Sequence, residues 1–74
     1  MRLTVRLFAF FRDGRFRERE CDYPEGTTVR EIITSLGIDP GEVGVIMLNS
    51  RHCSQDQVVH QGDKLAIFPV IGGG

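Results

Sequence analysis

Residues 26–37 read GTTVREIITSLG, and this stretch decides the fold because it specifies one helix from end to end. Thr28 is a favourable helix N-cap, and Glu31 follows three residues later, which completes a capping box. Apolar residues then recur at helical spacing and form one stripe; they are Val29, Ile32, Ile33 and Leu36. Gly37 suits the left-handed conformation that commonly ends a helix. A helix this short needs a second layer to cover its stripe.

The chain before the helix predicts two strands. From Arg2 to Phe8 the residues alternate, so that one face carries Leu3, Val5 and Leu7. Asp13-Gly14 suits the positive φ angles of a tight hairpin turn, and 15–23 is the expected partner strand. The charges of Arg17-Glu18-Arg19-Glu20 exclude burial on both faces and place this second strand at a sheet edge.

The chain after the helix predicts two further strands. Residues 45–48 are a continuous apolar run, as expected of a strand buried on both faces. Turns are expected at 49–51 and at Gly62-Asp63, and the segment 55–60 between them is irregular. The last strand runs from Lys64 to Ile71, with Leu65 and Ile67 facing inward.

The order of these elements is hairpin, helix, strand, irregular segment and strand. The apolar first and last strands suit the centre of a sheet, whereas the charged second strand suits an edge. We therefore predict an α+β chain with the β-grasp (ubiquitin-like) fold, a mixed sheet of four to five strands with one main helix across one face. The predicted domain spans residues 1–71, and residues 72–74 form a flexible glycine tail.

Composition narrows the class of protein. Nine basic and ten acidic residues among 74 remove the electrostatic argument for nucleic-acid binding. No apolar run approaches the roughly 20 residues that span a bilayer, and the N-terminus has no signal-peptide pattern, which predicts a cytoplasmic protein without a membrane partner. In that compartment Cys21 and Cys53 are expected to be unpaired thiols.

Metal and hydrolase chemistry are not expected from the histidines and cysteines. His52-Cys53 and His60 lack a paired ligand spacing such as C-x₂-C, so a surface loop accounts for them and no metal is predicted. A Cys–His nucleophile is also disfavoured, because neighbouring residues of a strand point to opposite faces.

Three glycines end the sequence, Gly72, Gly73 and Gly74. One interpretation is a frayed end without function. The other is that the terminal carboxylate is a reactive group, because glycine passes through narrow channels closed to other residues. Four extended residues beyond Val70 reach at most roughly 13–14 Å, which is enough to enter a partner's active site.

Four stretches of the chain resemble the MoaD/ThiS family of ubiquitin-like sulfur carriers. They are Val5-Arg6-Leu7-Phe8-Ala9, Gly26-Thr27-Thr28-Val29, Gly62-Asp63 and Ile67-Phe68-Pro69-Val70 leading into the glycines. The resemblance implies a carrier rather than an enzyme. An E1-like (MoeB/ThiF-type) partner would use ATP and Mg to adenylate Gly74, a sulfur donor would convert it to a thiocarboxylate, and Gly72 and Gly73 would provide passage.

The resemblance leaves the acceptor open. A single Pro69 and three glycines depart from the common pattern of two prolines and two glycines. Leu7-Phe8-Ala9 and Phe68-Pro69 favour molybdopterin synthesis, with the large subunit of molybdopterin synthase as acceptor. Val70-Ile71 points to thiazole synthase instead. A protein modifier that forms isopeptide bonds through Gly74, and an interaction module with an inert tail, are the remaining alternatives.

Alternation also predicts a docking surface. If Leu65 and Ile67 face the helix, Phe68 and Val70 face the opposite side, and the first strand sends Phe8 there. Phe10 is a further candidate. An exposed apolar patch of Phe8, Phe68 and Val70, with Pro69 among them, would be a partner-binding site beside the tail. Coverage by loops or by self-association is the alternative.

Overall fold

The structure is a computed structural model, and it describes residues 1–70. Its elements are one helix, two 3₁₀ turns and five strands. In chain order they are β1 (Arg2–Leu7), η1 (Ala9–Arg12), β2 (Glu18–Asp22), α1 (Val29–Ser35), η2 (Pro40–Glu42), β3 (Val43–Leu48), β4 (Arg51–His52) and β5 (Lys64–Pro69).

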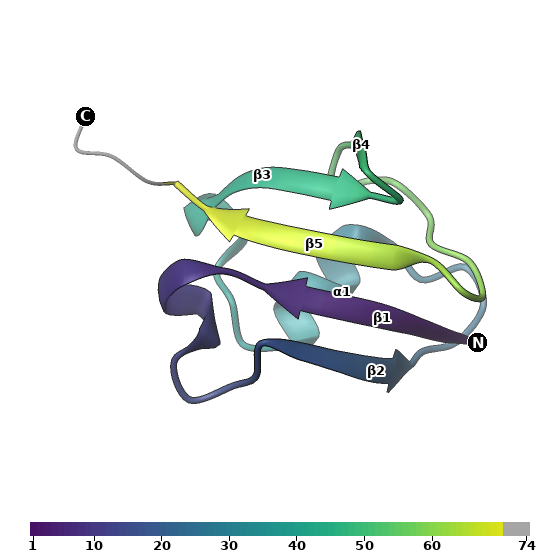
Figure 1. The fold of residues 1–74 in the computed structure, drawn as a ribbon. Coiled ribbons are helices and arrows are strands. Elements are labelled where there is room, and N and C mark those ends of the chain that lie inside the picture. The colour runs from purple at the N-terminus through teal and green to yellow at the C-terminus, as the bar shows by residue number, and fades with distance from the viewer. Residues whose placement is uncertain (71–74) are drawn as a thin grey trace.

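The five strands form one mixed sheet in the order β2-β1-β5-β3-β4. β1 and β5 pair in parallel at its centre, and the remaining pairs are antiparallel. Figure 1 shows α1 lying behind the sheet, across one face only. This is the β-grasp arrangement, so the predicted fold, the central first and last strands and the edge position of β2 are confirmed.

The helix forms as its sequence predicts. The Thr28 side chain accepts from the Glu31 backbone, and the Glu31 side chain accepts from the Thr28 backbone, so both halves of the capping box are present. Gly37 has a φ of +75° directly after the C-cap. The stripe is buried, and it meets the inward residues of the sheet in one core; the fully buried helix residues are Val29, Ile32 and Ile33.

The connection between β1 and β2 differs from the predicted tight hairpin. β1 ends at Leu7, the 3₁₀ turn η1 follows, and β2 begins only at Glu18. Phe11 explains the difference, because its ring is 2% exposed and fills the core, which a two-residue turn at Asp13-Gly14 could not achieve. The Arg15 guanidinium then fastens the connection to the helix end by donating to the Leu36, Gly37 and Phe11 carbonyls.

The prediction that β3 is buried on both faces is wrong. Ile46 is buried against the core, but Val45 is 39% exposed on the opposite face. β3 therefore buries one face only, because no second layer covers the far side of the sheet in the described part of the chain. A continuous apolar run indicates two apolar faces, and it cannot distinguish a buried face from an exposed one.

Candidate functional site

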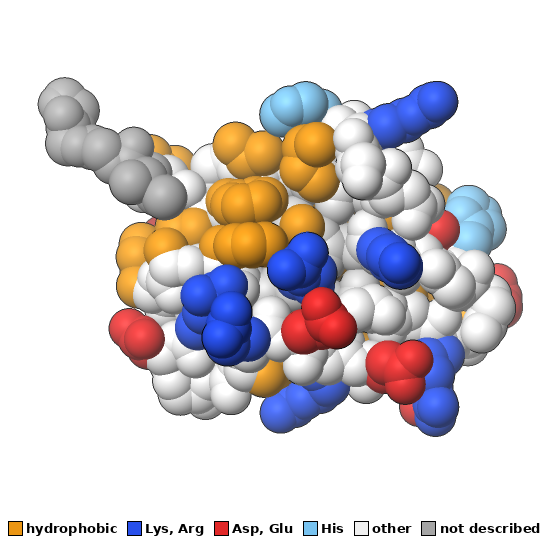
Figure 2. Space-filling model, viewed as in Figure 1, with side chains coloured by type: hydrophobic (Ala, Val, Ile, Leu, Met, Phe, Trp, Pro, Cys, Tyr) orange, Lys and Arg blue, Asp and Glu red, His pale blue; other side chains and the backbone are white. Residues whose placement is uncertain are grey.

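The outer face of the sheet, on the side away from α1, carries the candidate site. Along β5, Leu65 and Ile67 are fully buried, whereas Ala66 and Phe68 between them are only partly buried. The register pairs Phe68 with Val45 and Ala66 with Met47, so β3 adds apolar side chains to the same face. Figure 2 shows these side chains gathered into one patch beside the C-terminal end of the described chain.

Phe8 and Phe68 form the centre of this patch. Their ring centroids lie 4.0 Å apart with planes inclined by 13°, a stacked pair. Phe8 follows β1 with extended backbone angles, so it continues the alternation of that strand. The structure thus brings together the two aromatic residues that alternation assigned to one face.

The remaining predicted residues do not all lie where they were expected. Val70 is 61% exposed and lies at the edge of the patch, as expected. Pro69 is buried, since its register partner Val43 lies on the helix side, although it contributes to the rim of the patch. Phe10 does not join Phe68, because Ala9 has a φ of +51° and ends the alternation; its ring packs edge-on against Phe11 at 5.0 Å.

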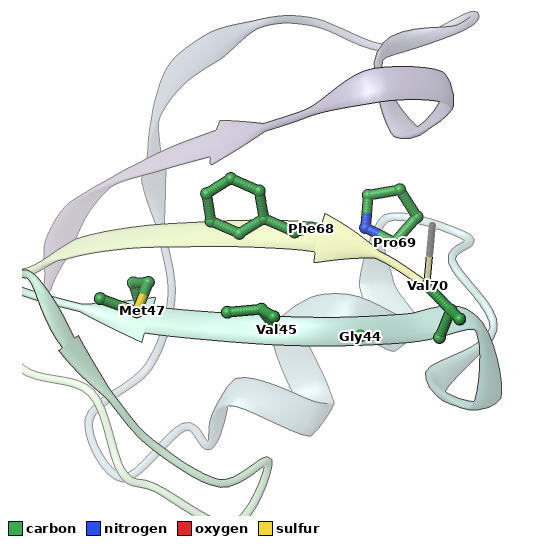
Figure 3. A pocket seen from close by; sticks show the side chains of 6 residues that line it. All are labelled: Gly44, Val45, Met47, Phe68, Pro69 and Val70. Atoms are coloured by element: carbon green, nitrogen blue, oxygen red, sulfur yellow. The ribbon is translucent and has the colours of Figure 1, made fainter. Parts of the chain in front are cut away.

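Part of the patch is hollowed into an open groove of about 710 Å³ over β3 and the end of β5. Its lining is almost entirely apolar and consists of Gly44, Val45, Met47, Phe68, Pro69 and Val70 (Figure 3). Three of these residues, Gly44, Val45 and Met47, were not predicted as part of the site. The sequence did contain a signal for two of them, because apolar residues at positions 45 and 47 of one strand lie on the same face of a sheet.

Arginines border the patch on the β1 side. The Arg6 and Arg12 guanidinium carbons lie 5.4 and 5.2 Å from the Phe8 ring centroid, within the range of cation–π attraction. Arg6 also pairs with Glu18 at 3.1 Å, and Arg12 Nε donates to the Leu7 carbonyl at 2.7 Å. Two arginines therefore border the apolar centre, and the charge of one of them, Arg6, is paired with Glu18.

Further along the outer face, two ion pairs join β1 to β2. Arg2 Nε donates to Asp22 Oδ1 at 3.0 Å, a pair between β1 and the edge strand. This hydrogen bond from Arg2 holds the pKa of Asp22 below its usual value. The paired charges satisfy one another, and the apolar end of the face is left as the surface that water solvates poorly.

The cysteines offer little chemistry. Both are free thiols, as predicted. Each also packs against the core. Burial raises the pKa of Cys21 and of Cys53, which disfavours the nucleophilic thiolate. Within residues 1–70 no three His, Cys, Asp or Glu side chains come together as a metal site would require.

The predicted reactive residues Gly72, Gly73 and Gly74 lie outside the described residues. The structure does describe the residues shortly before them, Pro69 and Val70, which we call the root of the tail. Val70, the last described residue, lies at the end of the apolar groove, and its N–H donates to the Glu42 carbonyl at 2.9 Å. In the described part of the chain, no helix is long and apolar enough to cross a membrane.

Comparison with known proteins gives one family and several similar structures. The sequence model of the ThiS family matches residues 5–74. A protein described as molybdopterin converting factor, subunit 1, from Pyrococcus furiosus is 28% identical, with a TM-score of 0.76 over 96% of this chain and 99% of that one.

Two further structures show the same fold at lower identity. Small archaeal modifier protein 1 of Haloferax volcanii is 21% identical, with a TM-score of 0.74 over 95% of this chain and 98% of that one. A chain from the complex of subunits 1 and 2 of molybdopterin-converting factor from Helicobacter pylori is 18% identical, with a TM-score of 0.65 over the full length of both chains.

Proposed function

The chain belongs to the ThiS family, and on that premise we propose that it is a sulfur carrier whose reactive group is the carboxylate of Gly74. The observation that carries the proposal is an exposed apolar groove and aromatic patch at the root of a tail that ends in three glycines. The patch offers a docking surface, and the tail offers a group that reaches into the docked partner.

Two chemical steps start from this carboxylate. An E1-like partner, using ATP and Mg, forms the acyl-adenylate, with pyrophosphate as the leaving group. Hydrosulfide supplied by a donor then attacks the acyl carbon; the C–S bond forms as the C–O bond to AMP breaks, AMP leaves and the thiol proton is lost to solvent. The product is a thiocarboxylate that donates its sulfur to an acceptor.

The carrier itself supplies position rather than acid or base. Docking through the patch places the tail in the partner's active site, which converts a collision into a reaction within one complex. An exposed thiocarboxylate is prone to hydrolysis, and a narrow channel that admits glycine would exclude water around it. Cys21 and Cys53 take no part, since both pack against the core.

For the acceptor, we propose the large subunit of a molybdopterin synthase. The support is the 28% identity over nearly the whole chain to the protein described as subunit 1 of a molybdopterin converting factor. The pairing of subunits 1 and 2 in the Helicobacter pylori complex is the kind of assembly we propose.

Two observations favour second candidates. The matching family is ThiS, which supports a thiazole-forming acceptor, and a modifier protein shares the fold. Offering the thiocarboxylated chain to both acceptor enzymes distinguishes the pathways: sulfur transfer to the molybdopterin precursor is expected, and transfer only to the thiazole would reverse the assignment. Lysine conjugates on cellular proteins would instead identify a modifier.

Adenylation is tested by exchange of labelled pyrophosphate into ATP in the presence of the chain and the E1-like enzyme from the same genome. We expect exchange that depends on the chain. A variant with one alanine added after Gly74 is the matched control, because it keeps the domain and the patch but removes the glycine carboxylate; it should support no exchange. Equal exchange with both proteins would contradict the proposal.

A further inference from the structure

Gly44 stands where a strand ordinarily carries a side chain. Gly44 lies in β3, between Val43 and Val45, and is exposed to solvent. Glycine in a strand interior gives up packing and raises the entropy cost of folding, by roughly 0.5–1 kcal/mol relative to alanine. In strands it often marks a bulge or a close approach of another backbone. Both features are present here.

The bulge is evident from the register between β3 and β5. Val45 pairs with Phe68 and Val43 pairs with Pro69, so β3 has one extra residue, Gly44, between two consecutive residues of β5. Bulges bend a strand and change the direction of nearby side chains, and they are common beside active sites. This bulge lies opposite the point where the tail begins.

The close approach is to backbone atoms of the tail root. A Cβ built on Gly44 would lie 2.8 Å from the Pro69 carbonyl oxygen, 3.0 Å from its carbonyl carbon and 3.0 Å from Val70 Cα. All three neighbours are backbone atoms, so no flexible side chain could turn away from an added methyl group. Any residue other than glycine would have to push Pro69 and Val70 from their positions.

A hydrogen bond to the residue just before β3 fastens the same segment. The Val70 N–H donates to the Glu42 carbonyl at 2.9 Å, just before β3 begins. The last described residue thus bonds to the Glu42 carbonyl and lies close to the bare backbone of Gly44. Figure 3 shows Gly44 and Val70 at one end of the groove. These contacts set the direction of the chain at Val70.

We propose that Gly44 is a positioning residue: its missing side chain lets the bulge hold Pro69 and Val70 so that the glycine tail leaves toward the partner's active site. The proposal rests on the proposed function, because it assigns Gly44 to the alignment of the Gly74 carboxylate. Gly44 touches no reacting atom. Misalignment of a reacting group by about 1 Å costs on the order of 100-fold in rate.

The test compares Gly44→Ala with Gly41→Ala. Gly41 is a close control, because it lies three residues away in η2 and the atoms nearest to its added Cβ belong to the Asp39 side chain, with Oδ1 at 3.3 Å, rather than to Pro69 or Val70. The first readout is amide hydrogen exchange at Val70 by NMR. We expect it to be slow in the wild type and in Gly41→Ala, and at least about 10-fold faster in Gly44→Ala once the hydrogen bond to Glu42 is disturbed.

The second readout is adenylation by the E1-like enzyme from the same genome. With Gly44→Ala as its substrate, the enzyme should show a kcat about 10- to 100-fold lower than with the wild-type chain. The KM for the chain should change by less than about three-fold, since Phe8 and Phe68 remain in place. Gly41→Ala should match the wild type. A role in docking would raise KM instead, and a role in stability would change neither constant for the folded fraction.

Three results would overturn the proposal. They are unchanged Val70 exchange in Gly44→Ala, a loss in KM alone, and loss of the folded state by circular dichroism, which would assign the glycine to the fold. Failure of the proposed function would give a different result. A wild-type chain that is never adenylated would contradict the sulfur-carrier proposal, but the Val70 exchange experiment would still show whether Gly44 holds Val70 in place.

Discussion

The two faces of the sheet are made by alternate residues of the same strands, yet they serve opposite purposes. On the inner face Leu7, Leu65 and Ile67 are fully buried against α1. On the outer face their neighbours Phe8, Ala66 and Phe68 are partly exposed, with no layer above them in residues 1–70. One face stabilises the fold, and the other carries the proposed docking surface.

The outer face is itself divided along its length. Toward β2 it carries ion pairs, Arg2 with Asp22 and Arg6 with Glu18, whose groups are more than half exposed and contribute little to stability. Toward the end of β5 it is apolar, which water disfavours and a partner can cover. The proposed docking surface is therefore the apolar part of the outer face, toward the end of β5.

Substitution of an inner-face residue should have the largest effect. Ile67→Ala removes a fully buried side chain from the centre of the core, and we expect the free energy of unfolding to fall by about 2–5 kcal/mol. Urea denaturation followed by circular dichroism measures this loss. A loss below about 1 kcal/mol would break the distinction between the faces.

Phe68 is the next residue along β5 and faces outward, so its substitution should weaken partner binding more than folding stability. Phe68→Ala keeps the core and removes one ring of the stacked pair, so it should cost only about 0.5–1.5 kcal/mol of folding stability. Binding to the adenylating enzyme should weaken by about 2 kcal/mol, roughly 30-fold, as for a central aromatic anchor. Calorimetric titration measures the affinity; unchanged affinity would exclude the patch as the docking surface.

A polar substitution at the groove should sharpen the comparison. Val45→Thr nearly preserves shape and adds a hydroxyl group to a residue that is already 39% exposed. We expect a change in unfolding free energy within about 0.5 kcal/mol, as for ordinary surface positions, and binding about three-fold weaker. Urea denaturation and calorimetric titration measure the two quantities. Tighter binding would indicate that the partner presents a polar group there.

At the charged end of the outer face, the ion pair of Arg2 with Asp22 should make folding stability depend on pH in the acid range only. Because Arg2 lowers the pKa of Asp22, the pair stabilises the folded state above the unfolded pKa of Asp22, and this stabilisation is lost as the pH falls through the folded value. Arg2→Gln should raise the Asp22 pKa toward its ordinary 3.8. Carboxyl NMR titration measures the shift.

The control for this experiment is Arg30→Gln, which disrupts the ion pair of Arg30 with Asp56 on another part of the surface. It should leave the titration of Asp22 unchanged. Partner binding at neutral pH should be the same for the Arg2 variant and the wild type, and a clear loss would extend the docking surface to the charged end.

The parts of the fold that local sequence could predict are those with local causes. The capping box of Thr28 and Glu31 and the alternation in β1 and β5 each specify their element within a few residues. The connection between β1 and β2 could not be predicted, because η1 exists to bury Phe11 in a core assembled from distant elements.

The candidate site was predicted to a similar extent. The meeting of Phe8 with Phe68 could be inferred from alternation and from the neighbouring positions of the first and last strands. Gly44 was missed because the bulge depends on the pairing of β3 with β5 across the sheet. Val45 and Met47 were missed because a continuous apolar run indicates burial on both faces. Burial of Pro69 could have been predicted, because it continues the alternation that turns Leu65 and Ile67 inward.

The central claim is that this sheet presents a tail whose terminal carboxylate accepts sulfur. Intact mass spectrometry of the wild-type chain, after incubation with ATP, Mg, a sulfur donor and the E1-like enzyme from the same genome, tests it most directly. We predict the mass increase of one oxygen replaced by one sulfur, absent when an alanine is added after Gly74. An unchanged mass, with the enzyme active on another carrier, would contradict the claim.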